Sequence, residues 1–224
     1  MIDETHGTAR EEAAPHAGGG RTAPSLAVVL LNQTIALAAV LALLFLFLPS
    51  DAARAVLQRS PTLREATARL LAGLGAPGAA DLAIGLAAGA LMIGWNVLYQ
   101  SLLVRRGDHG RGEVRIGGGA GKAAAAYLLL STSFTEEVIF RGWFFPLVAV
   151  RFGAATGLAA SALLFTLTHL GKGIHGKVAV FAYGLILGGA WMITGSVWAC
   201  VLAHATVNGA AFFGPFGAGR AQRG

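Results

Sequence analysis

Two long apolar stretches, residues 26–48 and 82–104, limit most strongly what this chain can fold into. The hydrocarbon core of a bilayer is about 30 Å thick, and a helix of about 20 apolar residues crosses it. Each stretch is longer than that. Only 12% of the 224 residues are charged, whereas soluble domains carry roughly 25%. The sequence therefore predicts a multi-pass integral membrane protein whose surroundings are the lipid bilayer.

Four further apolar segments follow, at residues 123–150, 155–170, 178–193 and 197–213. The last three are short for a crossing, so we expect local thinning of the bilayer or shielding by neighbouring helices. Residues 51–78 are more polar, and Ser60 and Pro61 suit an N-cap and a first helical position. We expect a short helix there that lies in the membrane interface. The predicted fold is an all-α bundle of about six spans plus one interfacial helix.

The chain divides into three parts by composition. Residues 1–24 mix acidic and basic side chains with a run of glycines, a composition typical of a disordered tail. Residues 25–216 form the membrane-embedded domain, whose motif-bearing core is 123–213. Residues 217–224 form a second, short tail.

The basic residues predict the orientation in the membrane. With six crossings, eleven Lys and Arg residues fall on the side of both tails and five on the other side. Cytoplasmic loops carry the excess of Lys and Arg, so both tails should be cytoplasmic. The Ala-, Gly- and Arg-rich composition is typical of a bacterial chain, which suggests the inner (cytoplasmic) membrane. The net charge of +6 would also suit nucleic acid, but the basic residues flank the spans without interleaved aromatics, so we expect no nucleic-acid partner.

Five ionisable residues lie inside the predicted spans: Glu136, Glu137, Arg141, His169 and His204. Such residues are costly in a membrane and usually face a bundle interior or a cavity. They fall on three of the last four spans. This clustering predicts a functional site.

The spacing of these residues separates the two glutamates. Glu137 and Arg141 are four residues apart with the acid first, the favourable order for an ion pair on one helix face. Glu136 is rotated by about 100° from Glu137, so we expect it to be the carboxylate left outside the pair.

Three short motifs resemble, in order, those of the CAAX-protease and bacteriocin-processing (CPBP, or Abi) family. They are Glu136-Glu137-xxx-Arg141, Phe165-xxx-His169 and His204-xxx-Asn208. The similarity covers about residues 123–213, and each motif lies in an apolar segment. The resemblance implies an intramembrane endopeptidase that hydrolyses a peptide bond in a membrane-bound peptide or protein substrate.

By the same resemblance, Glu136 and His169 would activate the attacking water. His204 and Asn208 would then hold the developing oxyanion, a role that neutral imidazole and amide donors can fill. Glu137, Arg141 and Phe165 would support these groups. Arg141 would neutralise Glu137, so that a single acid remains reactive.

A metal mechanism is the first alternative. Glu136, His169 and His204 would supply the three protein ligands of a catalytic zinc ion and leave one position for water. The chain contains no His-Glu-x-x-His helix, however, and Asn208 suits a hydrogen-bond donor better than a ligand. We therefore favour a mechanism without a cofactor.

In two further alternatives the protein is not a protease. One is a non-catalytic membrane immunity or scaffold protein of the same fold. The other is a proton-coupled transporter, which would also use buried glutamates and histidines. A transporter predicts paired half-helices or an inverted repeat, and neither is evident in this sequence.

Two local features give expectations of their own. Pro146 lacks an N–H group and leaves the carbonyl of Gly142 without its helical partner, which predicts a kink near the end of the third segment. His175 falls in the basic loop before the fifth segment, where we expect a solvated side chain.

Overall fold

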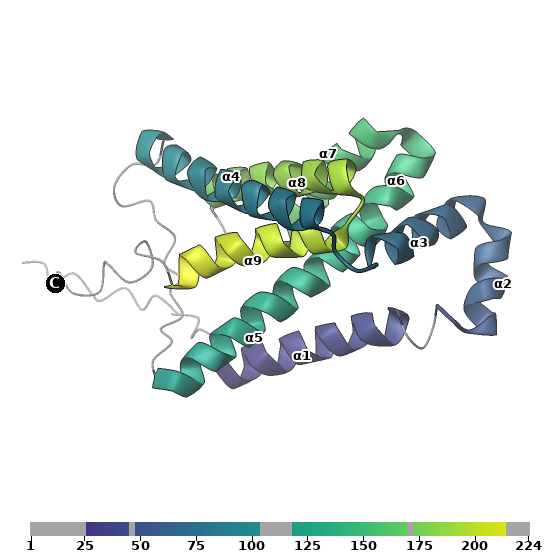
Figure 1. Cartoon of the computed structure of the whole chain (residues 1–224), viewed down its shortest axis with the longest axis horizontal. Helices are drawn as coiled ribbons and strands as arrows, with labels where there is room; N and C mark the ends of the chain where they lie inside the picture. The colour runs from purple at the N-terminus through teal and green to yellow at the C-terminus, as the bar shows by residue number, and fades with distance from the viewer. Residues whose placement is uncertain (1–25, 45–47, 104–117, 170–172, 214–224) are drawn as a thin grey trace, which may run out of the picture.

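The computed structural model describes residues 26–44, 48–103, 118–169 and 173–213, and every regular element in these ranges is a helix (Figure 1). The predicted all-α bundle is confirmed. Three helices are long and apolar enough to cross a membrane by length and composition: Ala79–Leu102, Gly121–Phe152 and Ile174–Thr194. Three shorter apolar helices lie at Leu26–Ala42, Ala154–Thr168 and Val197–Phe212. The two predicted tails, 1–24 and 217–224, lie outside the described residues.

Helices α4 (Ala79–Leu103) and α9 (Val197–Phe213) lie side by side through the bundle (Figure 1). Two glycines of α4, four residues apart, face α9. A Cβ added at Gly85 would lie 2.7 Å from the carbonyl oxygen of Ala199, and one at Gly89 would lie 2.8 Å from Cβ of Thr206. Small residues at this spacing allow the two backbones to approach closely.

The segment that carries the glutamates is a continuous run of three helical elements. It consists of α5 (Gly118–Glu137), the π-helix η2 (Val138–Phe144) and α6 (Phe145–Phe152). The sequence predicted a kink at Pro146, and the π-helix η2, which it did not predict, ends two residues before this proline. Such wide turns are rare and frequently occur at functional sites.

Helices α1 (Leu26–Ala42), α7 (Ala154–Thr168) and α8 (Ile174–Thr194) complete the bundle. Helix α1 packs along α5, and α7 packs against α8 (Figure 1). A Cβ at Gly184 of α8 would lie 2.8 Å from Cα of Ala162 on α7. Gly195 ends α8 at φ 66°, a left-handed conformation that favours glycine.

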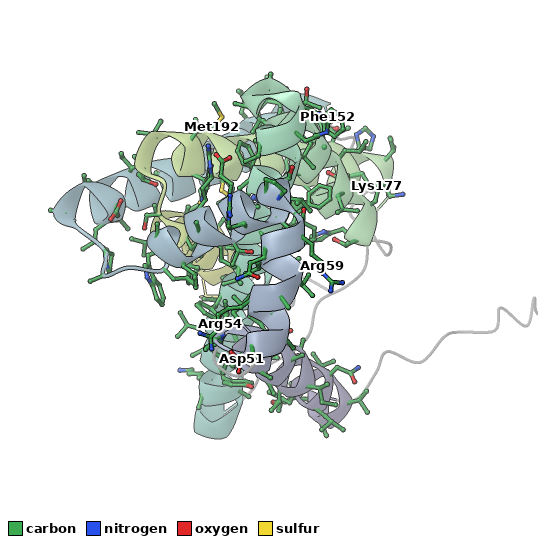
Figure 2. The ribbon with its side chains drawn as sticks, turned by 90° about the vertical axis from the view of Figure 1, so that its right-hand side faces the viewer. Asp51, Arg54, Arg59, Phe152, Lys177 and Met192 are labelled. Carbon is green, nitrogen blue, oxygen red and sulfur yellow. The ribbon has the colours of Figure 1, made fainter. Side chains whose placement is uncertain are left out.

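We predicted a single interfacial helix between the first two spans, and that number is wrong. Two helices occupy this region, α2 (Asp51–Arg59) and α3 (Pro61–Gly73), and both lie at one end of the bundle (Figures 1 and 2). The predicted cap is confirmed: the hydroxyl of Ser60 accepts a hydrogen bond from the backbone N–H of Leu63, and Pro61 begins α3. Because Ser60 is extended, it breaks the helix in two. Helix α3 packs on η2 through Leu70.

Candidate active site

Glu137 ends α5 as a fully buried carboxylate. Its Oε1 accepts a hydrogen bond from Nη1 of Arg141 at 3.0 Å, and both side chains are 0% exposed. The predicted ion pair is therefore present, although the helix changes from α to π between the two residues. The second guanidinium nitrogen, Nη2, donates to the carbonyl oxygen of Gly184 at 3.3 Å. Arg141 thus ties the glutamate-bearing helix to α8.

His204 of α9 contacts the same oxygen of Glu137. The distance from Nδ1 of His204 to Oε1 of Glu137 is 2.8 Å, and His204 is 7% exposed. Glu137 therefore has a second partner besides Arg141, which the spacing of the motifs did not indicate. An ionised carboxylate can only accept, so Nδ1 of His204 carries the proton in this contact.

Glu136 is the more accessible of the two acids. Its side chain is 27% exposed, and its Oε2 lies 3.9 Å from Nε2 of His204. The two ring nitrogens of His204 therefore face different carboxylates, Nδ1 the buried Glu137 and Nε2 the accessible Glu136. As expected from the helical rotation, Glu136 lies outside the Glu137–Arg141 pair.

The aromatic ring of Phe165 lies among the charged groups. Its centroid is 4.4 Å from Cζ of Arg141, 4.8 Å from the ring of His169 and 5.8 Å from the ring of His204. Phe165 is 2% exposed and also packs edge-on against Phe140 at 5.2 Å. It brings α7, α9 and η2 together at one point, a role that the spacing of the motif alone did not reveal.

His169 is the C-terminal cap of α7 rather than a residue inside the helix. Its Nδ1 lies 2.8 Å from the carbonyl oxygen of Phe165. A carbonyl accepts only, so Nδ1 of His169 donates the hydrogen in this contact. A neutral histidine in this tautomer can receive a proton at Nε2.

Asn208 lies one turn beyond His204 on α9 and is half-buried. The structure thus links the site residues pairwise. His204 contacts both glutamates and Phe165, Arg141 contacts Glu137 and Phe165, and His169 packs against Phe165. His175 behaves differently from our expectation of a solvated residue. It is half-buried near the start of α8, and its Nδ1 lies 2.9 Å from the hydroxyl of Tyr99 on α4.

The described residues do not assemble the zinc ligand set. Within the ranges that the structure describes, no three His, Cys, Asp or Glu side chains are grouped so that they could hold a metal ion. The nitrogen Nδ1 of His204 is also engaged by Glu137. A histidine that binds zinc commonly donates its other ring N–H to a carboxylate, so this contact leaves Nε2 of His204 able to serve as a ligand.

The contact with Glu137 also determines whether His204 can donate a hydrogen bond from its other ring nitrogen, Nε2. In the neutral ring the only N–H points to Glu137, so Nε2 has no hydrogen to give. His204 can donate at Nε2 only as an imidazolium, which carries both protons.

Residues 121–210 match the family model for the type II CAAX prenyl endopeptidase Rce1-like domain. No curated protein and no solved structure matches the chain. The matched segment runs from α5 into α9 and contains all three motifs. The match confirms the resemblance to the CAAX-protease family and supports an intramembrane protease at the family level.

Proposed function

We propose that this protein is an intramembrane endopeptidase that hydrolyses a peptide bond in a membrane-associated substrate. The observation that carries the proposal is the contact of His204 with both glutamates. Helices α5 and α9 bring together residues 67 positions apart in the chain, at 2.8 Å, in an otherwise apolar bundle. Ionisable side chains are rare inside a membrane protein, and where they cluster they usually mark a functional site.

Glu136 and His169 activate the attacking water in this proposal. Glu136 is the less buried of the two acids, with 27% of its side chain exposed although its Oε2 is buried, and we place the attacking water at this carboxylate. His169 donates from Nδ1 to the carbonyl of Phe165, and in this proposal its Nε2 takes the proton. Two acceptors of this kind can take the proton of a water molecule as it attacks the peptide carbonyl.

His204 and Asn208 stabilise the oxyanion that forms. As an imidazolium, His204 donates through Nε2, and the amide of Asn208 donates from the next turn of α9. Preorganised donors act strongly in a site of low dielectric constant. Glu137 lies between the imidazolium of His204 and the guanidinium of Arg141, and the carboxylate of Glu136 supplies the second negative charge.

The proposed mechanism uses no metal ion. It is supported by Asn208, which lies one turn from His204 on α9 and suits a hydrogen-bond donor better than a zinc ligand. Zinc held by Glu136, His169 and His204 is the competing mechanism, and metal analysis of the purified protein distinguishes the two.

The substrate we propose is a membrane-bound peptide or a protein with a hydrophobic segment, because a site between apolar helices selects chains that enter the bilayer. The family model is named for prenylated CAAX substrates; for this chain we propose only the broader class. We place the protein in a bacterial inner membrane with both termini in the cytoplasm, from the distribution of Lys and Arg.

A comparison of peptide termini tests the proposal. Cells that carry the wild type, Glu136→Gln or Glu65→Gln would be compared for new termini among membrane and secreted peptides. Glu65 is a matched acid on α3 that is exposed and paired with Arg69, so its variant should cleave like the wild type. New termini present with the wild type and Glu65→Gln but lost with Glu136→Gln support a protease and identify its substrate. Identical profiles for all three would favour the immunity or scaffold protein.

A further inference from the structure

A pocket lies between α3 and the C-terminal end of α8, away from the three motifs. Its volume is about 290 Å³, and it is lined by Arg69, Ala72, Trp191, Met192 and Gly195. Pockets that hold a whole small ligand usually measure about 300–1,000 Å³. This pocket is at the lower limit of that range, so it suits a headgroup and the first part of a chain better than an entire large ligand.

The pocket is formed where α3 meets the turn between α8 and α9. A Cβ added at Gly73 of α3 would lie 2.6 Å from the carbonyl oxygen of Gly195. Close by, Nε1 of Trp198 donates to the carbonyl oxygen of Leu74 at 3.2 Å. These contacts hold the end of α3 against the turn, so the two walls of the pocket belong to elements that are tied together.

The lining combines one cation with apolar side chains. Arg69 is 47% exposed, and its Nη2 lies 2.6 Å from Oε1 of Glu65. A guanidinium has five N–H donors, so Arg69 can keep this exposed ion pair and still bind a phosphate oxygen. Ala72, Trp191 and Met192 offer an apolar wall beside it. The pocket therefore suits a ligand in which an anionic group is joined to a hydrocarbon chain.

The helices around the pocket carry an excess of positive charge. Helices α2 and α3 together have four arginines and two acids. Two of the arginines are paired with the acids, Arg54 with Asp51 and Arg69 with Glu65. The other two, at positions 59 and 64, are exposed and form no ion pair within the described residues. Figure 2 looks onto this end of the bundle, where Arg54 and Arg59 are labelled. This charge favours an anionic ligand.

Exposed apolar side chains border the same pocket. Leu71, next to Ala72, is 51% exposed, and Met192 and Ile193 at the end of α8 are 48% and 73% exposed. Arginines among exposed apolar side chains are typical of a membrane interface, where the apolar groups meet acyl chains and the guanidinium groups reach the headgroups. The surroundings of the pocket therefore favour a lipid over a soluble anion.

We propose that this pocket binds one anionic phospholipid, whose phosphate contacts Arg69 and whose acyl chain leaves along Met192. The two helices that the lipid touches, α3 and α8, are far apart in the chain. A lipid bound between them contacts both at once, so it stabilises the folded bundle. The site is independent of the proposed peptide hydrolysis, because none of its residues belongs to the candidate active site.

Thermal unfolding of the purified protein in detergent tests the proposal. The protein would be mixed with phosphatidylglycerol, with phosphatidylcholine of the same acyl chains, or with inorganic phosphate. At about ten times Kd, phosphatidylglycerol should raise the midpoint by about 3–6 °C, and the other two should leave it unchanged. Native mass spectrometry should find one phosphatidylglycerol retained per chain. Equal shifts with both lipids, or an equal shift with inorganic phosphate, overturn the proposal.

Three variants locate the lipid. Arg69→Gln removes the cation, and Ala72→Phe fills the pocket from an exposed position while it keeps every charge. Arg54→Gln is the matched control, since Arg54 is an exposed arginine that is paired with an acid but does not line the pocket. Each midpoint is compared with that of the same variant without lipid.

The shift with phosphatidylglycerol should be lost in Arg69→Gln and Ala72→Phe and kept in Arg54→Gln. If Arg69→Gln does not fold, Ala72→Phe decides alone. A full shift in Ala72→Phe, or an equal loss in Arg54→Gln, would show that the lipid does not bind in this pocket. Peptide cleavage is not measured, so failure of this proposal is distinguishable from failure of the proposed function.

Discussion

The guanidinium of Arg141 lies over the ring of Phe165, with Cζ 4.4 Å from the ring centroid. Both side chains are at most 2% exposed, so this cation–π contact forms away from water, where such contacts are strongest. Phe165 also touches the rings of both histidines. The ring thus connects the buried charge of Arg141 with the two residues to which we assign proton transfer and oxyanion binding.

Phe165→Leu should lower both stability and activity. The leucine loses the cation–π contact, which is worth about 2 kcal/mol when desolvated, and no longer supports His169 and His204. We expect a loss of about 1–3 kcal/mol in the free energy of unfolding, together with a clear fall in kcat. Phe152→Leu is the control, because Phe152 is 66% exposed and makes its own, more distant cation–π contact with Arg151. Thermal unfolding and cleavage assays would check both variants, and equal losses would contradict the special role of Phe165.

Glu137→Gln should destabilise the protein strongly. The substitution leaves Arg141 as a buried cation without its counter-charge, which typically costs about 3–5 kcal/mol. The corresponding change at an exposed pair, Glu65→Gln beside Arg69, should cost less than about 1 kcal/mol. Chemical or thermal unfolding in detergent would measure the difference. The double variant Glu137→Gln with Arg141→Met should recover part of the loss, and a lack of recovery would show that the pair is not the cause.

Gly184→Ala should push α7 and α8 apart. A Cβ at this position would lie 2.8 Å from the backbone Cα of Ala162, so a backbone has to move. The same residue provides the carbonyl that accepts from Arg141. We expect a loss of about 1–3 kcal/mol and reduced activity. Gly189→Ala on the same helix meets nothing within 4 Å and should be neutral. Equal unfolding midpoints for the two variants would refute the close helix contact.

Treatment with a tight chelator should leave peptide cleavage unchanged, because the proposed mechanism uses only side chains of this chain. Elemental analysis of the purified protein should then find well under one zinc ion per molecule. Activity that is lost on chelation and restored by added zinc would instead establish the metal mechanism.

The sequence predicted the helices better than their ends. The six apolar helices occupy the predicted segments because long apolar runs have one stable form in a bilayer. Ser60 was recognised as a cap, yet the helix that precedes it was not, since residues 51–59 are too polar to stand out as an apolar segment. The sequence predicted a kink at Pro146 and did not predict the π-helix that precedes it. The pairing of His175 with Tyr99 joins α4 to α8 across 76 positions, and no local pattern indicates it.

The sequence by itself determined the apolar spans, the three motifs and the pairing of Glu137 with Arg141. These follow from composition and from the fixed period of a single helix, which places residues four positions apart on one face. Only the tertiary structure decided that His204 contacts Glu137, that Glu136 remains accessible, and that Phe165 lies between the charged groups. Those relationships depend on how α5, α7 and α9 are positioned relative to one another in the bundle. Close contacts with neighbouring helices position α7 and α9, such as Gly184 of α8 against Ala162 and Gly85 of α4 against Ala199, and spacing along a single helix does not determine them.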